Sequence, residues 1–288
     1  MQPHAIPASD GHLLAARAYG EPRRARAGVL IVAAMGVEQT YYAEFAHWLA
    51  QRGLYVLSFD YRGVGHSRGG RSLRGLEADI RTWAERDTAA ALAWLRDQLP
   101  GRPLAWIGHS LGGQIVGMVP GHESLAAVIT VTAASGYVGD NAPALRRRVW
   151  LFWDVAVPLA TALFGYFPGR RLRMVGDLPA GVIRQWQRWC RSPDYLFGVE
   201  PELAAVYAAC RWPLLALAAS DDELLTERGW RKLHAHYSGA RLTAEVLTPA
   251  DGDAERLGHF GFFRRRFADT LWPRAAQWLD AQLLQGSP

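Results

Sequence analysis

Short apolar runs alternate with amphipathic stretches along most of this chain. The runs are rich in Val, Ile, Leu and Ala and carry few charges, which is typical of strands buried on both faces of a sheet. They predict strands at 28–34, 54–59, 104–107, 126–132, 214–219 and 242–247. Residues 12–18 alternate more loosely and predict an antiparallel strand at the sheet edge.

Between these runs, apolar residues recur at helical spacing. Tyr42, Phe45, Ala46 and Leu49 share one face of a predicted helix, and Gly53 supplies its stop. A long helix is expected at 79–99, and an amphipathic one at 271–283. Strands that alternate with helices predict right-handed crossovers and a mostly parallel, doubly wound α/β sheet.

One connection is too long for a simple crossover. Roughly eighty residues separate the strand at 126–132 from the strand at 214–219, whereas a crossover needs a dozen or so. This stretch is rich in Trp, Phe and Tyr. We therefore expect a helical cap at 137–200, inserted into a core of residues 1–136 and 201–288. It should cover the carboxyl edge of the sheet, where open α/β folds bind ligands.

Candidate chemistry lies in the stretch from Leu104 to Met118. Residues 108–112 read Gly-His-Ser-Leu-Gly and match G-x-S-x-G, a sharp turn that carries a serine between a strand and a helix. The turn forces a strained backbone at Ser110, so the residues two before and two after it must be small. The pentapeptide is a weak signal alone, and the strand before it and the helix after it strengthen it.

A serine hydroxyl is a poor nucleophile until a base takes its proton and an acid orients that base. After such a turn the partners are expected in the order acid, then histidine. Of the nine histidines, only His259 lies in a loop after the last predicted strand. For the acid we prefer Asp222, because of its spacing to the next helix start, over Asp221, with Asp140 third. The other carboxylates of 220–223 are expected to be solvated turn residues or a helix cap.

The tetrahedral oxyanion formed by such a nucleophile needs two backbone donors. One should be the amide of Leu111, directly after the serine. The other should come from the loop after the strand at 28–34, where Gly36 allows a sharp turn. We expect the Val37 amide there, with the Met35 amide as the alternative.

The motifs together resemble those of the α/β-hydrolase superfamily over nearly the whole chain, in particular the serine aminopeptidase-like and monoacylglycerol lipase-like branch. The resemblance implies that Ser110 is the nucleophile, Asp222 the acid and His259 the base. It also implies that 60–67 is a structural loop bracing the oxyanion side. The residues that carry it are Asp60-Tyr-Arg-Gly-Val-Gly-His-Ser67, Gly108-His-Ser-Leu-Gly-Gly113, Ser220-Asp-Asp222 and Gly258-His259.

The chain departs from this pattern at one place. Many relatives carry His-Gly in the oxyanion loop, where this chain has Met35-Gly36. The motifs Met35-Gly-Val37, Pro168-Gly-Arg, Trp186-Gln-Arg-Trp189 and 258–264 also resemble a bacterial subgroup of predicted hydrolases. That resemblance implies the fold and the triad, and no substrate.

These residues predict a serine hydrolase that needs no cofactor and no metal. A carboxylic ester or thioester with an apolar acyl or aromatic group is the expected small-molecule substrate. Amide or peptide cleavage and acyl transfer to an alcohol would use the same triad, and a non-catalytic binding protein of this fold is the alternative from another class. The expected substrate contacts are Met35, His109, Trp150 and Trp186.

Charge and cysteine content indicate which partners and which cellular location to expect. The chain has 288 residues and a formal charge of +5, but its basic residues are nearly all Arg in short, widely separated runs. We expect a solvated surface and no nucleic-acid partner. Cys190 and Cys210 form no disulfide framework or metal spacing, and no secretory signal precedes them, so a cytoplasmic location is expected. No oligomeric state is predicted.

The apolar stretch 149–167 is nearly long enough to span a bilayer. Asp154 and Pro158 interrupt it, and the surrounding pattern is that of a globular protein. We therefore expect a buried or membrane-touching amphipathic segment, with peripheral membrane contact, in place of a spanning helix.

Overall fold

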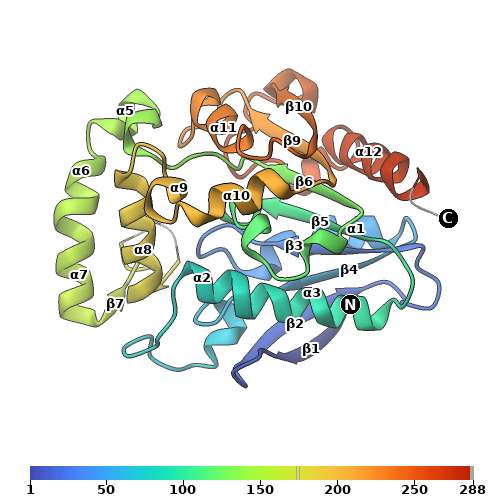
Figure 1. The fold of residues 1–288 in the computed structure, drawn as a ribbon, viewed down its shortest axis with the longest axis horizontal. Coiled ribbons are helices and arrows are strands. Elements are labelled where there is room, and N and C mark those ends of the chain that lie inside the picture. The colour runs from blue at the N-terminus through green and yellow to red at the C-terminus, as the bar shows by residue number, and fades with distance from the viewer. Residues whose placement is uncertain (173, 175, 286–288) are drawn as a thin grey trace.

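The expected parallel sheet is present, and an antiparallel pair of strands extends its edge (Figure 1). The structure is a computed structural model that describes residues 1–172, 174 and 176–285. Within these residues the large sheet has the strand order β1-β2-β4-β3-β5-β6-β9-β10. Strands β1 and β2 are antiparallel to their neighbours, and the others pair in parallel. The strands are β1 (Gln2–Pro7), β2 (Leu13–Tyr19), β3 (Ala27–Val32), β4 (Leu54–Phe59), β5 (Leu104–His109), β6 (Ala127–Val131), β9 (Pro213–Ala219) and β10 (Arg241–Leu247).

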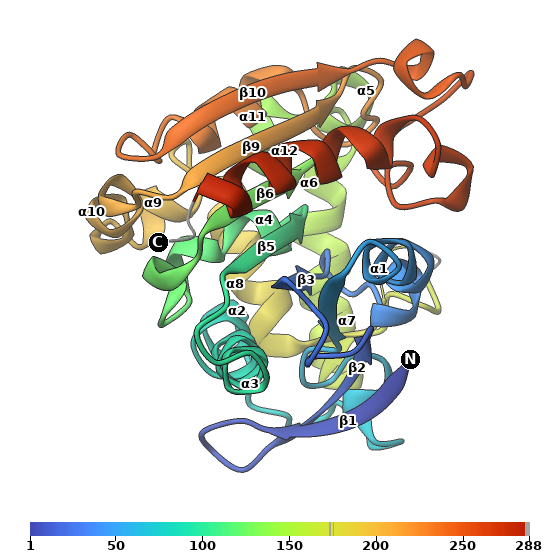
Figure 2. The same cartoon turned by 90° about the vertical axis from the view of Figure 1, so that its right-hand side faces the viewer.

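Helices cover both faces of the sheet. Figure 2 shows α1 and α12 on one side of it and α3 and α10 on the other. Every residue of β3, β4, β5 and β6 is buried, as the continuous apolar runs predicted. The helices are α1 (Ala43–Ala50), α2 (Ile80–Thr82), α3 (Ala89–Gln98), α4 (Leu111–Gln114), α5 (Pro143–Arg146), α6 (Val149–Leu151), α7 (Val157–Phe164), α8 (Ala180–Arg191), α9 (Leu196–Val199), α10 (Glu202–Ala209), α11 (Glu227–His234) and α12 (Leu271–Gln285).

Two predicted helices have a different form in the structure. The helix expected at 79–99 is α2 and α3 joined by a π-helical stretch at 83–88. The helix after the serine is short, because α4 gives way to a 3₁₀ turn at Val116–Met118. Gly117 lies there against the ring of Tyr207, where an added Cβ would come within 2.7 Å.

The connection from β6 to β9 contains the expected group of helices. Helices α6, α7 and α8 stand together at the left of Figure 1, beside the short antiparallel pair β7 (Tyr166–Phe167) and β8 (Leu178–Pro179). A π-helical stretch, Phe152–Ala156, joins α6 to α7. Gln185 of α8, almost fully buried, accepts a hydrogen bond of 2.6 Å from the amide of Ile80. This contact fixes the group of helices to the start of α2.

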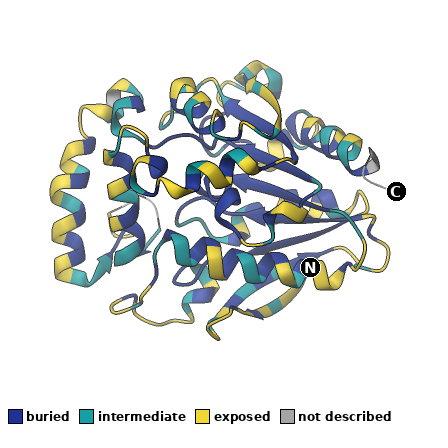
Figure 3. Ribbon diagram, viewed as in Figure 1, coloured by how far each residue is buried: buried dark blue, intermediate teal, exposed yellow. Residues whose placement is uncertain are grey.

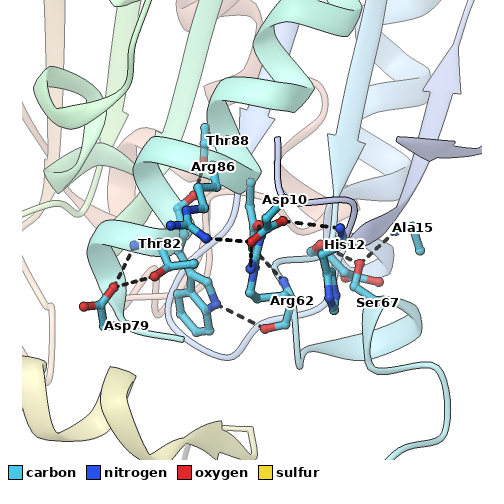
Figure 4. Close-up of polar contacts among 12 residues, drawn as sticks. Asp10, His12, Ala15, Arg62, Ser67, Asp79, Thr82, Arg86 and Thr88 are labelled. Carbon is cyan, nitrogen blue, oxygen red and sulfur yellow. Dashed lines mark hydrogen bonds and ion pairs between the residues drawn. The ribbon is translucent and has the colours of Figure 1, made fainter. Parts of the chain in front are cut away.

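A buried ion-pair network holds the loop that follows β4 (Figure 4). The Arg62 guanidinium lies 2.7 Å from the Asp87 carboxylate and 2.6 Å from that of Asp10. Arg62 and Asp87 are buried, whereas Arg86, which also binds Asp10, is half exposed. The network therefore joins the β1–β2 turn, the loop after β4 and the π-helical stretch at 83–88.

Burial follows the layers, with buried residues on the strands and exposed ones on the outer sides of the helices (Figure 3). The stretch 149–167 forms part of the group beside the sheet and is exposed along its outer side. Over the part of the chain that the structure describes, no helix combines the length and the apolar character needed to cross a bilayer.

Candidate active site

Ser110 lies at the tip of a strained turn between β5 and α4. Its φ and ψ are 50° and −113°, a left-handed backbone that a serine rarely adopts. An added Cβ on Gly108 would come within 2.3 Å of the Gly112 carbonyl, and one on Gly112 within 2.1 Å of the Val32 carbonyl. The predicted need for small residues two before and two after the serine is therefore confirmed.

His259 and Asp222 meet beside this turn, although they are far apart in sequence. The Nδ1 of His259 lies 2.8 Å from Oδ2 of Asp222, and both side chains are almost fully buried. The other oxygen of Asp222 accepts from the amides of Leu224 and Leu225. Asp222 thus has one oxygen fixed by the backbone and the other on the imidazole. His259 and Ser110 line the same cavity.

Asp221 and Glu223 have a different task from the one expected. Asp221 accepts from the amides of Leu257 and Gly258 at 2.9 Å each, and Glu223 accepts from the His259 amide at 3.1 Å. The sequence led us to expect solvated turn residues or a helix cap, whereas both carboxylates bind backbone amides of the loop that carries His259. The consecutive carboxylates 221–223 bind the backbone and the imidazole of one loop. The acidic run itself was the available signal, because the loop that it binds lies 36 residues further along the chain.

Asp140, the third acid candidate, forms its ion pairs with residues other than His259. Its carboxylate is buried and lies 3.1 Å from the Arg228 guanidinium and 3.7 Å from the Lys232 ammonium. Its backbone carbonyl accepts from the Thr226 hydroxyl, which caps α11. Asp140 therefore serves the start of α11 and not the imidazole.

His109, expected to contact substrate, is fully buried and hydrogen-bonds to His259 and Tyr42. Its Nε2 donates to the carbonyl of His259 at 3.0 Å, so its Nδ1 accepts from the Tyr42 hydroxyl at 2.8 Å. The Tyr42 hydroxyl in turn accepts from the Ala34 amide at 2.9 Å. Burial, followed by the charge of His259, lowers the pKa of His109 to about 3, so this ring is neutral. The prediction for His109 is wrong because its ring faces the interior.

In the loop after β3, the Val37 amide that was expected to bind an oxyanion already has an acceptor. The Val37 amide already donates to the Ala34 carbonyl at 3.1 Å, so it is not free for an oxyanion. The turn therefore favours the alternative, Met35. Among the described residues, the backbone amides of Met35 and Leu111 have no hydrogen-bond acceptor. Asp60 fixes this loop by accepting from the Gln39 amide at 2.7 Å.

A cavity of about 460 Å³ opens above Ser110. Met35 and Trp186, two of the four expected substrate contacts, line it together with Trp153, Cys190 and Tyr195. Most of the remaining wall is also apolar and comes from α5, α6 and the loops around 141 and 224. The cavity is thus a largely apolar space between the sheet edge and the helices α6 and α8.

Trp150 does not contribute to this cavity. It is 59% exposed and lies on the outer side of α6, so the expected substrate contact is wrong. The sequence missed Gln114 and Tyr195, which meet at the cavity wall through a hydrogen bond of 2.9 Å. In the sequence, the one indication of this pair was the polar side chain of Gln114 in the apolar helix that follows Ser110.

In the described part of the chain, no group of three or more His, Cys, Asp or Glu side chains is placed to hold a metal ion. A serine and an imidazole line the cavity, and the imidazole lies on a buried carboxylate. Such an arrangement can activate a hydroxyl toward a carbonyl carbon.

Known proteins share this arrangement of sheet and turn. Residues 23–163 match the family described as serine aminopeptidase, S33. The fold is similar to that of a soluble variant of monoglyceride lipase from Saccharomyces cerevisiae, with a TM-score of 0.64 and 16% identity over 98% of this chain and 95% of that one. The chain has the α/β-hydrolase fold.

Two further proteins are similar to this chain. The esterase Pf2001 of Pyrococcus furiosus has a TM-score of 0.63 and 13% identity, over 98% of this chain and 90% of that one. The uncharacterized protein YfhR of Salmonella typhi is 33% identical over 107 residues, which span 36% of this chain but only 34% of YfhR. These similarities show the fold, and the activity has to be argued from the residues around the cavity.

Proposed function

We propose that this chain cleaves carboxylic esters or thioesters of apolar acyl or aromatic groups through a Ser110-His259-Asp222 triad. The observation that carries the proposal is the 2.8 Å contact between Asp222 and the imidazole of His259. That imidazole lines the same cavity as a serine on a strained turn. The chemistry needs all three side chains in this order.

The first half of the reaction forms an acyl-enzyme. The Ser110 hydroxyl attacks the carbonyl carbon while Nε2 of His259 takes its proton, and Asp222 holds Nδ1–H and stabilises the resulting imidazolium. The oxyanion of the tetrahedral intermediate accepts from the amides of Leu111 and Met35. When the intermediate collapses, His259 returns the proton to the departing alcohol or thiol and the acyl group stays on the serine.

The second half releases the acid. Water attacks the acyl carbonyl with His259 again as the base, and the proton returns to Ser110 as the carboxylic acid leaves. The apolar wall of the cavity suits the acyl chain or an aromatic group, because burial of such groups is favourable and demands no hydrogen-bond partner. Trp186 and Tyr195 would contact that group.

A chain-length series of p-nitrophenyl esters tests the substrate class. We expect turnover by the wild type to rise from acetate to medium-chain esters, since each added methylene buried gains about 0.8 kcal/mol. A Trp186→Ala variant should shift the preference toward longer or bulkier acyl groups. Equal turnover across the series would contradict an apolar acyl site, and transfer to an added alcohol in place of acid release would identify an acyltransferase.

A further inference from the structure

The outer face of the α6–α7 helix is almost entirely apolar. We define the outer face as the exposed residues of this helix, which lies at the edge of the molecule and is exposed along that edge (Figures 1 and 3). Asp154 is the one charged residue among them, and it pairs with Arg191. The large members are Trp150 (59% exposed), Leu151 (51%), Val155 (37%), Leu159 (58%) and Leu163 (69%).

The outer face forms a continuous row. Leu151, Val155, Leu159 and Leu163 follow one another at a spacing of four residues, so their side chains lie along one side of the helix. A contiguous apolar surface of this kind marks a contact with another protein or with a membrane. The inner side of the same helix has its own role, since Phe152 and Trp153 line the cavity.

The charges around the outer face favour a lipid surface over a protein. Residues 143–174 contain six arginines and one acidic residue, Asp154. Arg146, Arg147 and Arg148 are exposed just before α6, and Arg170 and Arg171 are exposed beyond α7, where Arg170 also pairs with Glu38. An apolar row with arginines at both ends matches the acyl and phosphate layers of an anionic bilayer.

We propose that the outer face of α6–α7 docks on an anionic lipid bilayer. Trp150, Leu159 and Leu163 enter the boundary between headgroups and acyl chains, and the flanking arginines bind lipid phosphates. The helix lies in the plane of the interface, with its inner side on the cavity. Docking needs no change in the core, because the face is already exposed.

The cavity opens beside the docked surface. Leu151 and Met174 are each about half exposed, and both also line the cavity, so they mark its mouth. This consequence rests on the proposed function: an apolar acyl substrate held in the bilayer would reach Ser110 without crossing water. The docking itself stands without any catalytic step.

Vesicle flotation of the full chain tests the proposal. We expect the wild type to float with vesicles of phosphatidylcholine and phosphatidylglycerol, and less with phosphatidylcholine alone. The double variant Leu159→Gln, Leu163→Gln should lose at least about tenfold in partitioning, because two leucines no longer enter the lipid. The matched control is Leu13→Gln, Leu242→Gln, at two other exposed leucines (61% and 43% exposed), which should float like the wild type.

A charge variant separates the arginines from the apolar row. Arg147→Gln should weaken binding to the anionic vesicles several-fold and reduce its salt dependence, since each basic residue near such a surface contributes about 1 kcal/mol. Arg24→Gln, at an arginine that is 85% exposed elsewhere on the surface, should have no effect.

Three results would overturn the proposal. They are a wild type that does not float with anionic vesicles, an equal loss in both leucine double variants, and a lipid-free dimer that only Leu159→Gln, Leu163→Gln dissociates. The last would show that a second copy covers the face. Failure of docking and failure of the proposed function stay distinct, because Ser110→Ala should float normally and the outer-face variant should keep wild-type turnover of a soluble short-chain ester.

Discussion

At the scale of single residues, hydrogen bonds of its backbone and of its side chain fix His259 in its loop. Its amide donates to Glu223, its imidazole contacts Asp222, and its carbonyl accepts from His109 and from the Thr132 hydroxyl. A catalytic base must keep its orientation to within a fraction of an ångström. The backbone contacts hold the loop in place, and the Asp222 carboxylate in contact with the ring would stabilise a charge on it.

This division predicts different losses for the two neighbouring aspartates. Asp222→Asn should lower kcat by about 10³–10⁴-fold, because the amide favours the wrong imidazole tautomer. Asp221→Asn keeps an acceptor for one of the two amides, so we expect a loss of only about tenfold. Ester turnover by the two variants, compared side by side at equal fold content, measures this. A larger loss at Asp221 would reverse the assignment of the acid.

Tyr42 and His109 join the loop of His259 to the loop after β3 through hydrogen bonds. Tyr42→Phe leaves the Ala34 amide and Nδ1 of His109 without a buried partner, at about 1–3 kcal/mol of stability. Since both loops lose a support, kcat should fall about tenfold with little change in KM. Tyr55→Phe is the control, because no hydrogen bond of the Tyr55 hydroxyl is found among the described residues. Equal kcat in the two variants would show that the link carries no catalytic role.

At the scale of elements, the turn at Ser110 depends on close backbone approach between β3 and α4. An alanine at 112 would place its Cβ 2.1 Å from the Val32 carbonyl, which cannot move without shifting the central strand. We expect Gly112→Ala to destabilise the fold by about 3 kcal/mol or more and to abolish turnover. Gly69→Ala should cost only about 1–2 kcal/mol, since that site has a positive φ but open space. Similar unfolding midpoints in urea would contradict this.

The ion-pair network of Figure 4 makes a second comparison at this scale. Arg62→Gln leaves the buried Asp87 carboxylate without its cation, so a loss of about 3–5 kcal/mol is expected. Arg86→Gln removes a half-exposed partner of Asp10 and should cost less than about 1 kcal/mol. Urea unfolding of both variants decides the matter, and comparable losses would refute the structural role given to Arg62.

At the scale of the whole molecule, two buried histidines link stability to pH. Burial lowers the pKa of His109 to about 3 and that of His234 to about 4, against about 6.5 in the unfolded chain. Between these values the unfolded state binds the extra protons, so their stabilising contribution is complete above about pH 6.5 and is lost on acidification. The loss is up to about 1.4 kcal/mol per pH unit for each histidine.

Urea unfolding at pH 7 and pH 5 measures this linkage. The wild type should be less stable at pH 5, and His234→Gln should show a shallower dependence on pH because one of the two groups is gone. The difference between the two proteins isolates His234 from the carboxyl groups, which they share. A pH dependence that His234→Gln leaves unchanged would show that this ring does not carry the effect.

Much of the core followed from the hydrophobic pattern alone. Strand β4 has the predicted bounds, 54–59, and the other parallel strands lie within about two residues of theirs. Strand β1 was missed, because Gln2–Pro7 contains two prolines and shows little alternation. Its pairing with β2 is a tertiary contact that local sequence does not encode.

The sequence predicted the site less well where a role depends on the orientation of a side chain or a backbone amide. Val37 and Met35 both lie in the predicted oxyanion loop, and only the turn geometry shows which amide is free. Trp150 and Trp186 are both in helices, but the helix of Trp150 is apolar on nearly every side, so its pattern does not say which side faces the cavity. His109 is fully buried, whereas Ser110, the next residue along the chain, lines the cavity, and successive side chains at a strand end point to opposite sides.

The proposed function requires Ser110 to be a nucleophile that His259 activates. A fluorophosphonate reacts with such a serine to form a stable covalent adduct, which mass spectrometry locates on the peptide that carries it. We predict one adduct per wild-type chain, on Ser110, none on Ser110→Ala, and labelling slowed by about 10³-fold or more in His259→Ala at unchanged fold content. A folded wild type that stays unlabelled, or that is labelled equally fast without His259, would contradict the account.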